Sequence, residues 1–192
     1  SYSAIAQAFH KTAAADTSKL LPEVEHYALN DYLHALNAGA SLSKDDRQDV
    51  INHLSRYTGL SADFIDKANL RIGPTQFRQQ LLADQRLILG RFDALVTGYN
   101  PTPAARDEYD PSLSLYLPAY TSTINNYLRQ SLGYESDLNY EVLNGQVGPW
   151  DLTHHGDGFL DVTPDLRDAM LQNPNLKLLV CSGHDDLPTP YL

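Results

Sequence analysis

The sequence has a single cysteine and few basic residues, which argues against an internal disulfide and against a nucleic-acid-binding surface. Cys181 is the only cysteine among 192 residues, so no disulfide can form within the chain. Lysine and arginine together number 14 against 24 acidic residues, which gives a formal net charge of −10 at pH 7. Surfaces that bind nucleic acid depend on clustered basic side chains. The sequence contains no such cluster, and we expect no nucleic-acid partner.

Long apolar segments are also missing. No window approaches the roughly 18 consecutive apolar residues that a membrane-spanning helix requires, so we expect no membrane partner. The opening residues, SYSAIAQAFHK, read as the middle of a helix and lack the basic-then-apolar order of a signal peptide. Hydrophobic residues make up 42% of the chain and charged residues 20%, a balance typical of a folded globular protein.

A series of short amphipathic helices is predicted over residues 1–90. Between residues 24 and 36, apolar side chains recur at steps of three and four, which places them on one helical face. Ser43, with Asp46 three residues later, is a typical N-terminal cap for the next helix. Pro74 is well placed as the first residue of another helix. The pattern favours a helical region rather than a sheet-centred fold.

Glycine and proline interrupt the rest of the chain, residues 91–192. The segment LILGRFDALVTGYN predicts a short strand or hairpin, and LNYEVLNG predicts another strand. The stretch LKLLV at 176–180 is a largely apolar run without alternation, as expected of a strand covered on both faces. A helix followed by such a strand is an αβ unit, so we predict a mainly α fold with a partial α/β sheet. The other elements expected in this region are a linker, helices over 116–132 and 163–172, and a strand over 176–181.

Two carboxylates follow that strand. In open parallel α/β sheets, catalytic groups gather beyond the carboxyl ends of the strands, and Asp185 and Asp186 lie at this point. A carboxylate there can accept the Nδ1 hydrogen of a histidine and stabilise the imidazolium that forms when the histidine takes a proton from a serine. An ordinary polar loop is the alternative, and spacing does not decide between them.

A resemblance to a known family covers almost the whole chain in unchanged order. The sequence resembles the bacterial branch of the serine carboxypeptidase family, which has the α/β-hydrolase fold, at YALNDYL, LSRYTGLSADFIDKANLRI, FRQQLLADQ, LGRFDALVTGYN, EYDPS, INNYLRQSLGYESDLNYEVLNG, PWDL, DLRDAMLQNPNLKLLVCSG and DDLPTP. The resemblance implies that residues 1–90 form the helical cap, or lid, over the active site. Residues 91–192 would form a partial α/β-hydrolase segment. It also implies a hydrolase that performs proteolysis on peptides without a cofactor, in a secreted or periplasmic location.

The family's triad acid lies in a Gly-x-x-Asp motif, followed in this branch by Thr-Pro. The match to Gly183, Asp186 and Thr189-Pro190 therefore implies that Asp186 is the acid. Asp185 stands where the branch more often has an aromatic or neutral residue. The chain contains no Gly-x-Ser-x-Gly nucleophile elbow. We thus expect a fragment that carries only the acid and the cap, is inactive alone, and has the remaining N- and C-terminal portions of the same protein as partners.

Weaker candidates complete the prediction. Trp150 is a candidate for lining a substrate pocket, although a single tryptophan more often serves packing. His154, His155 and Asp157 are metal-ligand residue types, but their spacing matches no zinc signature, and we expect no metal. His184 is too close to Asp186 in sequence to serve as its histidine. The alternative function is a free-standing helical module, derived from the cap, that binds another protein.

Overall fold

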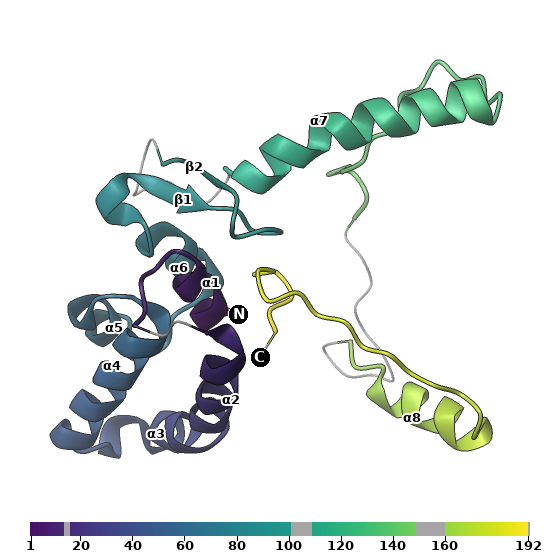
Figure 1. The fold of residues 1–192 in the computed structure, drawn as a ribbon. Helices are drawn as coiled ribbons and strands as arrows, with labels where there is room; N and C mark the ends of the chain where they lie inside the picture. The colour runs from purple at the N-terminus through teal and green to yellow at the C-terminus, as the bar shows by residue number, and fades with distance from the viewer. Residues whose placement is uncertain (14–15, 101–108, 149–159, 192) are drawn as a thin grey trace. The chain divides into compact units, whose positions relative to one another are not determined.

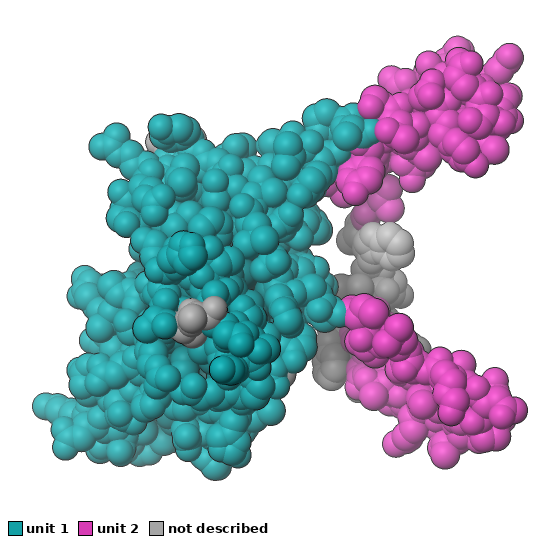
Figure 2. Space-filling view, viewed as in Figure 1, with its two compact units in different colours: residues 1–119, 182–192 teal, residues 120–181 magenta. Residues whose placement is uncertain are grey.

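The computed structural model describes residues 1–13, 16–100, 109–148 and 160–191. These residues are mostly helical (Figure 1), which confirms the prediction of a predominantly α fold. They separate into two compact units (Figure 2). Unit 1 comprises Ser1–Ala119 together with Ser182–Leu192, and unit 2 comprises Tyr120–Cys181. The boundary predicted at residue 90 therefore lies inside unit 1, to which the end of the chain also belongs.

The described part of unit 1 contains six complete α-helices, a hairpin and the first residues of a seventh helix. A π-helical turn joins the second helix to the third, and α1 contacts both α2 and α4. The helices are α1 (Tyr2–Ala8), α2 (Thr17–Tyr27), α3 (Leu33–Ala38), α4 (Lys44–Thr58), α5 (Ala62–Lys67) and α6 (Pro74–Gln80).

The ends of α4 follow the local signals in the sequence. The Ser43 hydroxyl accepts the Asp46 N–H at 3.1 Å and donates to the Asp46 carboxylate at 2.6 Å. These two bonds confirm the predicted N-terminal cap. At the other end Gly59 adopts a φ of 71°, the left-handed conformation that commonly ends helices. Pro74 is the first residue of α6, also as predicted.

A single apolar core holds unit 1 together. The side chains of Ile5, Ile65 and Phe77, from α1, α5 and α6, are fully buried. The Tyr2 ring stacks on Phe77 with 4.2 Å between ring centroids. Leu187, near the end of the chain, is 1% exposed and belongs to the same core. The C-terminal segment is thus anchored in the helical unit.

The hairpin consists of β1 (Leu87–Leu89) and β2 (Thr97–Tyr99), which pair in antiparallel register. The hairpin predicted for this part of the sequence is therefore confirmed. We call residues 90–96, between the two strands, the hairpin loop. The Gly90 N–H closes the loop by donating to the Val96 carbonyl at 2.7 Å.

Two further helices follow the hairpin along the chain. Helix α7 runs over Pro111–Asn126 and continues as a π-helical turn over Tyr127–Ser131. The predicted helix over 116–132 is formed, but it begins at residue 111. Helix α8 spans Thr163–Gln172, the predicted bounds. None of the described residues between 120 and 181 is buried, so unit 2 has no core of its own.

The strand predicted over 176–181 is not formed. Among the described residues the only sheet is the β1–β2 hairpin, and neither 176–181 nor LNYEVLNG pairs with it. Leu179 is 86% exposed and Val180 is 77% exposed. A strand of this composition needs a hydrogen-bonding neighbour and cover on both faces. The described residues supply neither, and the apolar side chains of the segment remain in solvent.

Candidate functional site

The carboxylate of Asp186 is fixed by a residue three positions later. Asp186 is half-buried on the C-terminal loop, which we define as residues 182–191. Its Oδ1 accepts the Thr189 N–H at 3.2 Å, and its Oδ2 accepts the Thr189 hydroxyl at 2.7 Å. An ionised carboxylate has about four acceptor positions. Each oxygen of Asp186 therefore keeps capacity for another donor.

Backbone hydrogen bonds hold the residues on either side of Asp186. The Leu187 N–H donates to the Arg91 carbonyl at 3.0 Å, and the Ala94 N–H donates to the Asp185 carbonyl at 2.9 Å. Both partners, Arg91 and Ala94, belong to the hairpin loop. Since the Leu187 side chain is also in the core, hydrogen bonds and apolar packing hold the backbone at Asp186 against the rest of unit 1.

Asp185 is in a different environment from its neighbour. Burial raises the pKa of the Asp185 carboxyl, and the nearby Asp93 carboxylate raises it further, while His184 acts in the opposite direction. Asp93 is itself bonded to the Tyr116 hydroxyl at 2.7 Å. Within the described part of the chain, the Asp185 carboxylate accepts no hydrogen bond. Of the two candidate acids, Asp186 is the one with a fixed carboxylate.

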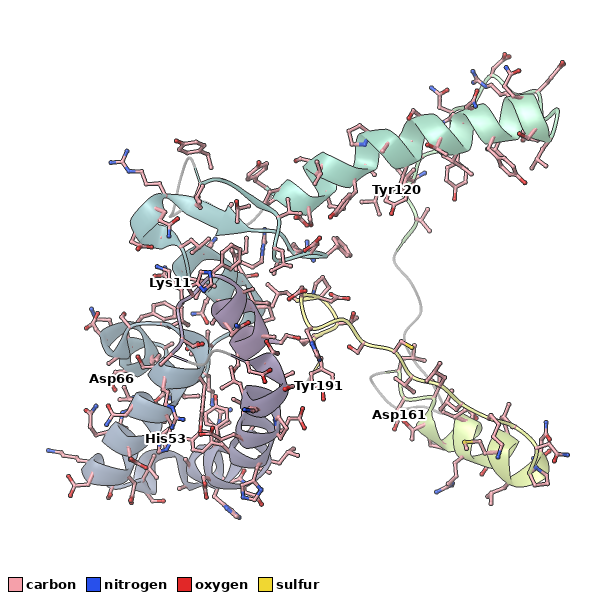
Figure 3. The ribbon with its side chains drawn as sticks, viewed as in Figure 1. Lys11, His53, Asp66, Tyr120, Asp161 and Tyr191 are labelled. Atoms are coloured by element: carbon pink, nitrogen blue, oxygen red, sulfur yellow. The ribbon has the colours of Figure 1, made fainter. Side chains whose placement is uncertain are left out.

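The far end of the C-terminal loop contacts the first two helices. Tyr191 lies near the end of the described chain and is labelled in Figure 3. Its hydroxyl donates to the Glu25 carboxylate of α2 at 2.6 Å, and its N–H donates to the Ser1 hydroxyl at 2.8 Å. The His184 ring lies edge-on to the Tyr191 ring at 4.9 Å between centroids. Among the described residues His184 and Asp186 form no hydrogen bond with each other, although only one residue separates them in the sequence.

The remaining candidates, Trp150, His154, His155 and Asp157, lie outside the described residues. Within the described ranges no three histidine, cysteine, aspartate or glutamate side chains are grouped so that they could hold a metal ion.

A separate pocket of about 330 Å³ lies between the start of α2 and the end of α4. Lys19, Glu23 and Arg56 contribute charged groups to it, but Arg56 pairs with Glu23 at 3.0 Å. Asp16, also in the lining, accepts the Ser18 N–H at 2.9 Å and caps α2. Most of its charged groups thus already serve the fold. No residue of the C-terminal loop lines the pocket, so it adds nothing to the chemistry of Asp186.

Sequence reasoning did not foresee the role of Thr189. The Thr189-Pro190 pair was used only as part of a motif, whereas the structure makes Thr189 the residue that orients Asp186. The Asp-x-x-Thr spacing was a usable signal, because an aspartate side chain often accepts hydrogen bonds from residues just ahead of it in the chain. The backbone bonds from Asp185 and Leu187 to the hairpin loop join segments that lie about 90 residues apart in the sequence. They leave no such local signal.

Comparisons with known proteins gave no relative. No protein-family model, curated protein or solved structure matches the chain. Among the helices that the structure describes, none is both long and apolar enough to span a lipid bilayer.

Proposed function

We propose that this chain is part of a serine carboxypeptidase of the α/β-hydrolase fold, in which Asp186 is the acid of a Ser-Asp-His triad. The observation that carries the proposal is the half-buried Asp186 carboxylate, whose two oxygens are each fixed by Thr189. The resemblance of the segments around Gly183 and Thr189-Pro190 to the family's acid motif supports the same residue.

In this proposal Asp186 acts through a histidine. A free acceptor position on its carboxylate takes the Nδ1 hydrogen, which leaves Nε2 to accept the proton of the serine hydroxyl as the serine oxygen attacks the C-terminal peptide bond. The histidine then gives this proton to the leaving amine as the C–N bond breaks. Water hydrolyses the acyl-serine by the same steps. Asp186 fixes the ring orientation and stabilises the positive imidazolium, and no cofactor takes part.

The serine would come from a part of the protein beyond these 192 residues, since the sequence has no Gly-x-Ser-x-Gly elbow. The family resemblance implies that the histidine also lies beyond them. Members of such a triad act as a unit, so the isolated chain is expected to be inactive. A secreted or periplasmic location belongs to the same proposal.

The exposed apolar residues of unit 2 support the proposal that other parts of the protein cover them. Folded proteins rarely leave contiguous apolar surface in water, and an unpaired apolar strand readily associates with other chains. Leu178, Leu179 and Val180 are all more than half exposed. We propose that this segment is a strand of the hydrolase sheet once the rest of the protein provides its neighbours. Residues 1–90 would then be the cap over the active site.

The second candidate is a free-standing helical module that binds another protein. It is favoured by one observation, namely that unit 1 has a core built from its own helices. The two candidates differ in what they predict for the purified chain. A module is expected to elute as a monomer and to melt cooperatively, whereas the peptidase segment is expected to associate through its exposed apolar residues until the rest of the enzyme is added.

The gene itself provides the first test. We expect the complete reading frame to encode a Gly-x-Ser-x-Gly before this segment and a histidine after it, and its product to release C-terminal residues from peptides. Size-exclusion chromatography of the 192-residue chain, with and without the rest of the protein, separates the two candidates. An intact reading frame without the serine motif would reject the peptidase.

A further inference from the structure

We infer that Asp110 and Ser112 are positioning residues for Asp186, because they hold the hairpin loop to which the backbone around Asp186 is bonded. The inference rests on the proposed function for its catalytic meaning. All the residues concerned lie in unit 1.

Asp110 gathers three donors on one carboxylate oxygen. Its side chain is buried, and Oδ1 accepts the Ser112 N–H at 2.9 Å, the Ser112 hydroxyl at 2.6 Å and the Arg91 N–H at 3.1 Å. The Ser112 hydroxyl, which is fully buried, accepts the Phe92 N–H at 3.2 Å. Two consecutive amides of the hairpin loop therefore bond to these two side chains.

The same loop residue continues the connection to the acid. Arg91 donates its N–H to Asp110, and its carbonyl accepts the N–H of Leu187, the residue after Asp186. Ala94, three residues further along the loop, donates to the residue before Asp186. A shift of the hairpin loop would move both neighbours of Asp186 together.

Close packing limits such a shift. A Cβ atom at Gly90 would lie 2.7 Å from the Ser112 Cβ, so the hairpin loop and the start of α7 are in direct contact. Arg78 is 1% exposed and links the residue just before the hairpin loop to the residue just before Asp110. Its Nε donates to the Leu89 carbonyl at 2.8 Å and its terminal NH2 to the Tyr109 carbonyl at 3.0 Å.

Capping of α7 does not account for the whole arrangement. A capping aspartate needs to accept only amide hydrogens of the first helical turn, as Asp110 does from Ser112. The bonds from Arg91 and Phe92 are additional and lead away from the helix. Hydrogen bonds to an ionised carboxylate are stronger than neutral ones, which suits Asp110 to hold a loop that has no regular secondary structure.

The test is amide hydrogen exchange, measured by NMR on the 192-residue chain. Ser112→Ala removes the acceptor of the Phe92 N–H. Ser114→Ala is the matched control, because the Ser114 hydroxyl donates to the Asp110 carbonyl at 3.1 Å in the same helical turn and has no described hydrogen bond to the hairpin loop. Loss of one hydrogen bond of ordinary strength changes an opening equilibrium by roughly tenfold.

We expect Ser112→Ala to raise the exchange rates of the Ala94 and Leu187 amides by about tenfold, with the amides of α4 within about twofold of their original rates. Ser114→Ala should change neither set. Asp110→Asn is the second variant, because it keeps an oxygen acceptor without the charge and should retain only part of the protection. Unchanged rates at Leu187 in Ser112→Ala, or a uniform rise throughout unit 1, would overturn the inference.

A second readout links positioning to catalysis. In the complete protein, Ser112→Ala should lower kcat while KM stays within about twofold, and Ser114→Ala should leave both unchanged; a normal kcat in Ser112→Ala would overturn the positioning role. If the exchange result is as expected but the complete protein hydrolyses no peptide, the proposed function fails and Asp110 and Ser112 still position the loop.

Discussion

Replacing Arg78 by methionine should destabilise unit 1 strongly. Methionine is similar in length and restores apolar packing, so the change mainly removes the guanidinium. Two of its donors reach the Leu89 and Tyr109 carbonyls at 2.8 and 3.0 Å in a site that is 1% exposed. A hydrogen bond involving a charged group contributes about 1.5–3 kcal/mol, and unsatisfied buried carbonyls add a desolvation term. The expected loss in the free energy of unfolding is about 3–5 kcal/mol.

Urea unfolding, followed by near-UV circular dichroism of the buried tyrosines of unit 1, measures this loss. The control is Arg71→Met, because Arg71 is exposed and its one described side-chain hydrogen bond, to the Leu36 carbonyl, is long at 3.4 Å. A change below about 0.5 kcal/mol is expected there. If Arg78→Met lowers the free energy of unfolding by less than about 1 kcal/mol, buried hydrogen bonding at the hairpin does not stabilise the unit as argued.

Three further predictions concern stability. Burial raises the pKa of Tyr57 to about 12 from the ordinary 10. The neutral side chain therefore contributes to the free energy of unfolding below pH 10, and this contribution is lost as the pH rises toward 12. Between pH 10 and pH 12 the free energy of unfolding, measured by urea titration, should fall by about 2 kcal/mol more in the original chain than in Tyr57→Phe. Equal losses would contradict the raised pKa of Tyr57. Gly90→Ala places a Cβ 2.2 Å from the Asp93 carbonyl oxygen and should lower stability by about 1–3 kcal/mol in thermal melts, whereas Gly145→Ala, with open space around it, should have no effect. Ser43→Ala removes the cap of α4 and should lower stability by about 1 kcal/mol by chemical denaturation; an unchanged midpoint would show that the cap is dispensable.

The helices could be predicted because their signals are local. Periodic apolar residues and the Ser43 cap are contained in single segments of sequence, and α8 was found with its bounds. The start of α7 was missed although its signal was present. Asp110-Pro111 is a capping residue followed by a proline at the first helical position, but the proline was interpreted as a break in the chain. The same proline chemistry correctly predicted α6.

The strand over 176–181 illustrates a limit of a different kind. An apolar composition predicts that other parts of the protein bury a segment. It does not identify which strands pair with that segment. The proposed acid could be narrowed to two residues, Asp185 and Asp186, because both follow the apolar run. Its surroundings could not be predicted, since the contacts of Leu187 with Arg91 and of Asp110 with Arg91 join irregular loops that have no periodic signature. The resemblance implies Asp186, and of the two aspartates Asp186 is the one whose carboxylate accepts hydrogen bonds from Thr189.

The central claim is that Asp186 orients a catalytic histidine, and peptide hydrolysis by the product of the complete reading frame tests it most directly. Asp186→Asn should reduce kcat by about 10⁴, because an amide in place of the triad acid favours the wrong histidine tautomer. Asp185→Asn is the matched control and should remain within about tenfold of the original rate, as expected for a group outside the proton-transfer path. Near-normal turnover in Asp186→Asn, or an equal loss in both variants, would contradict the account.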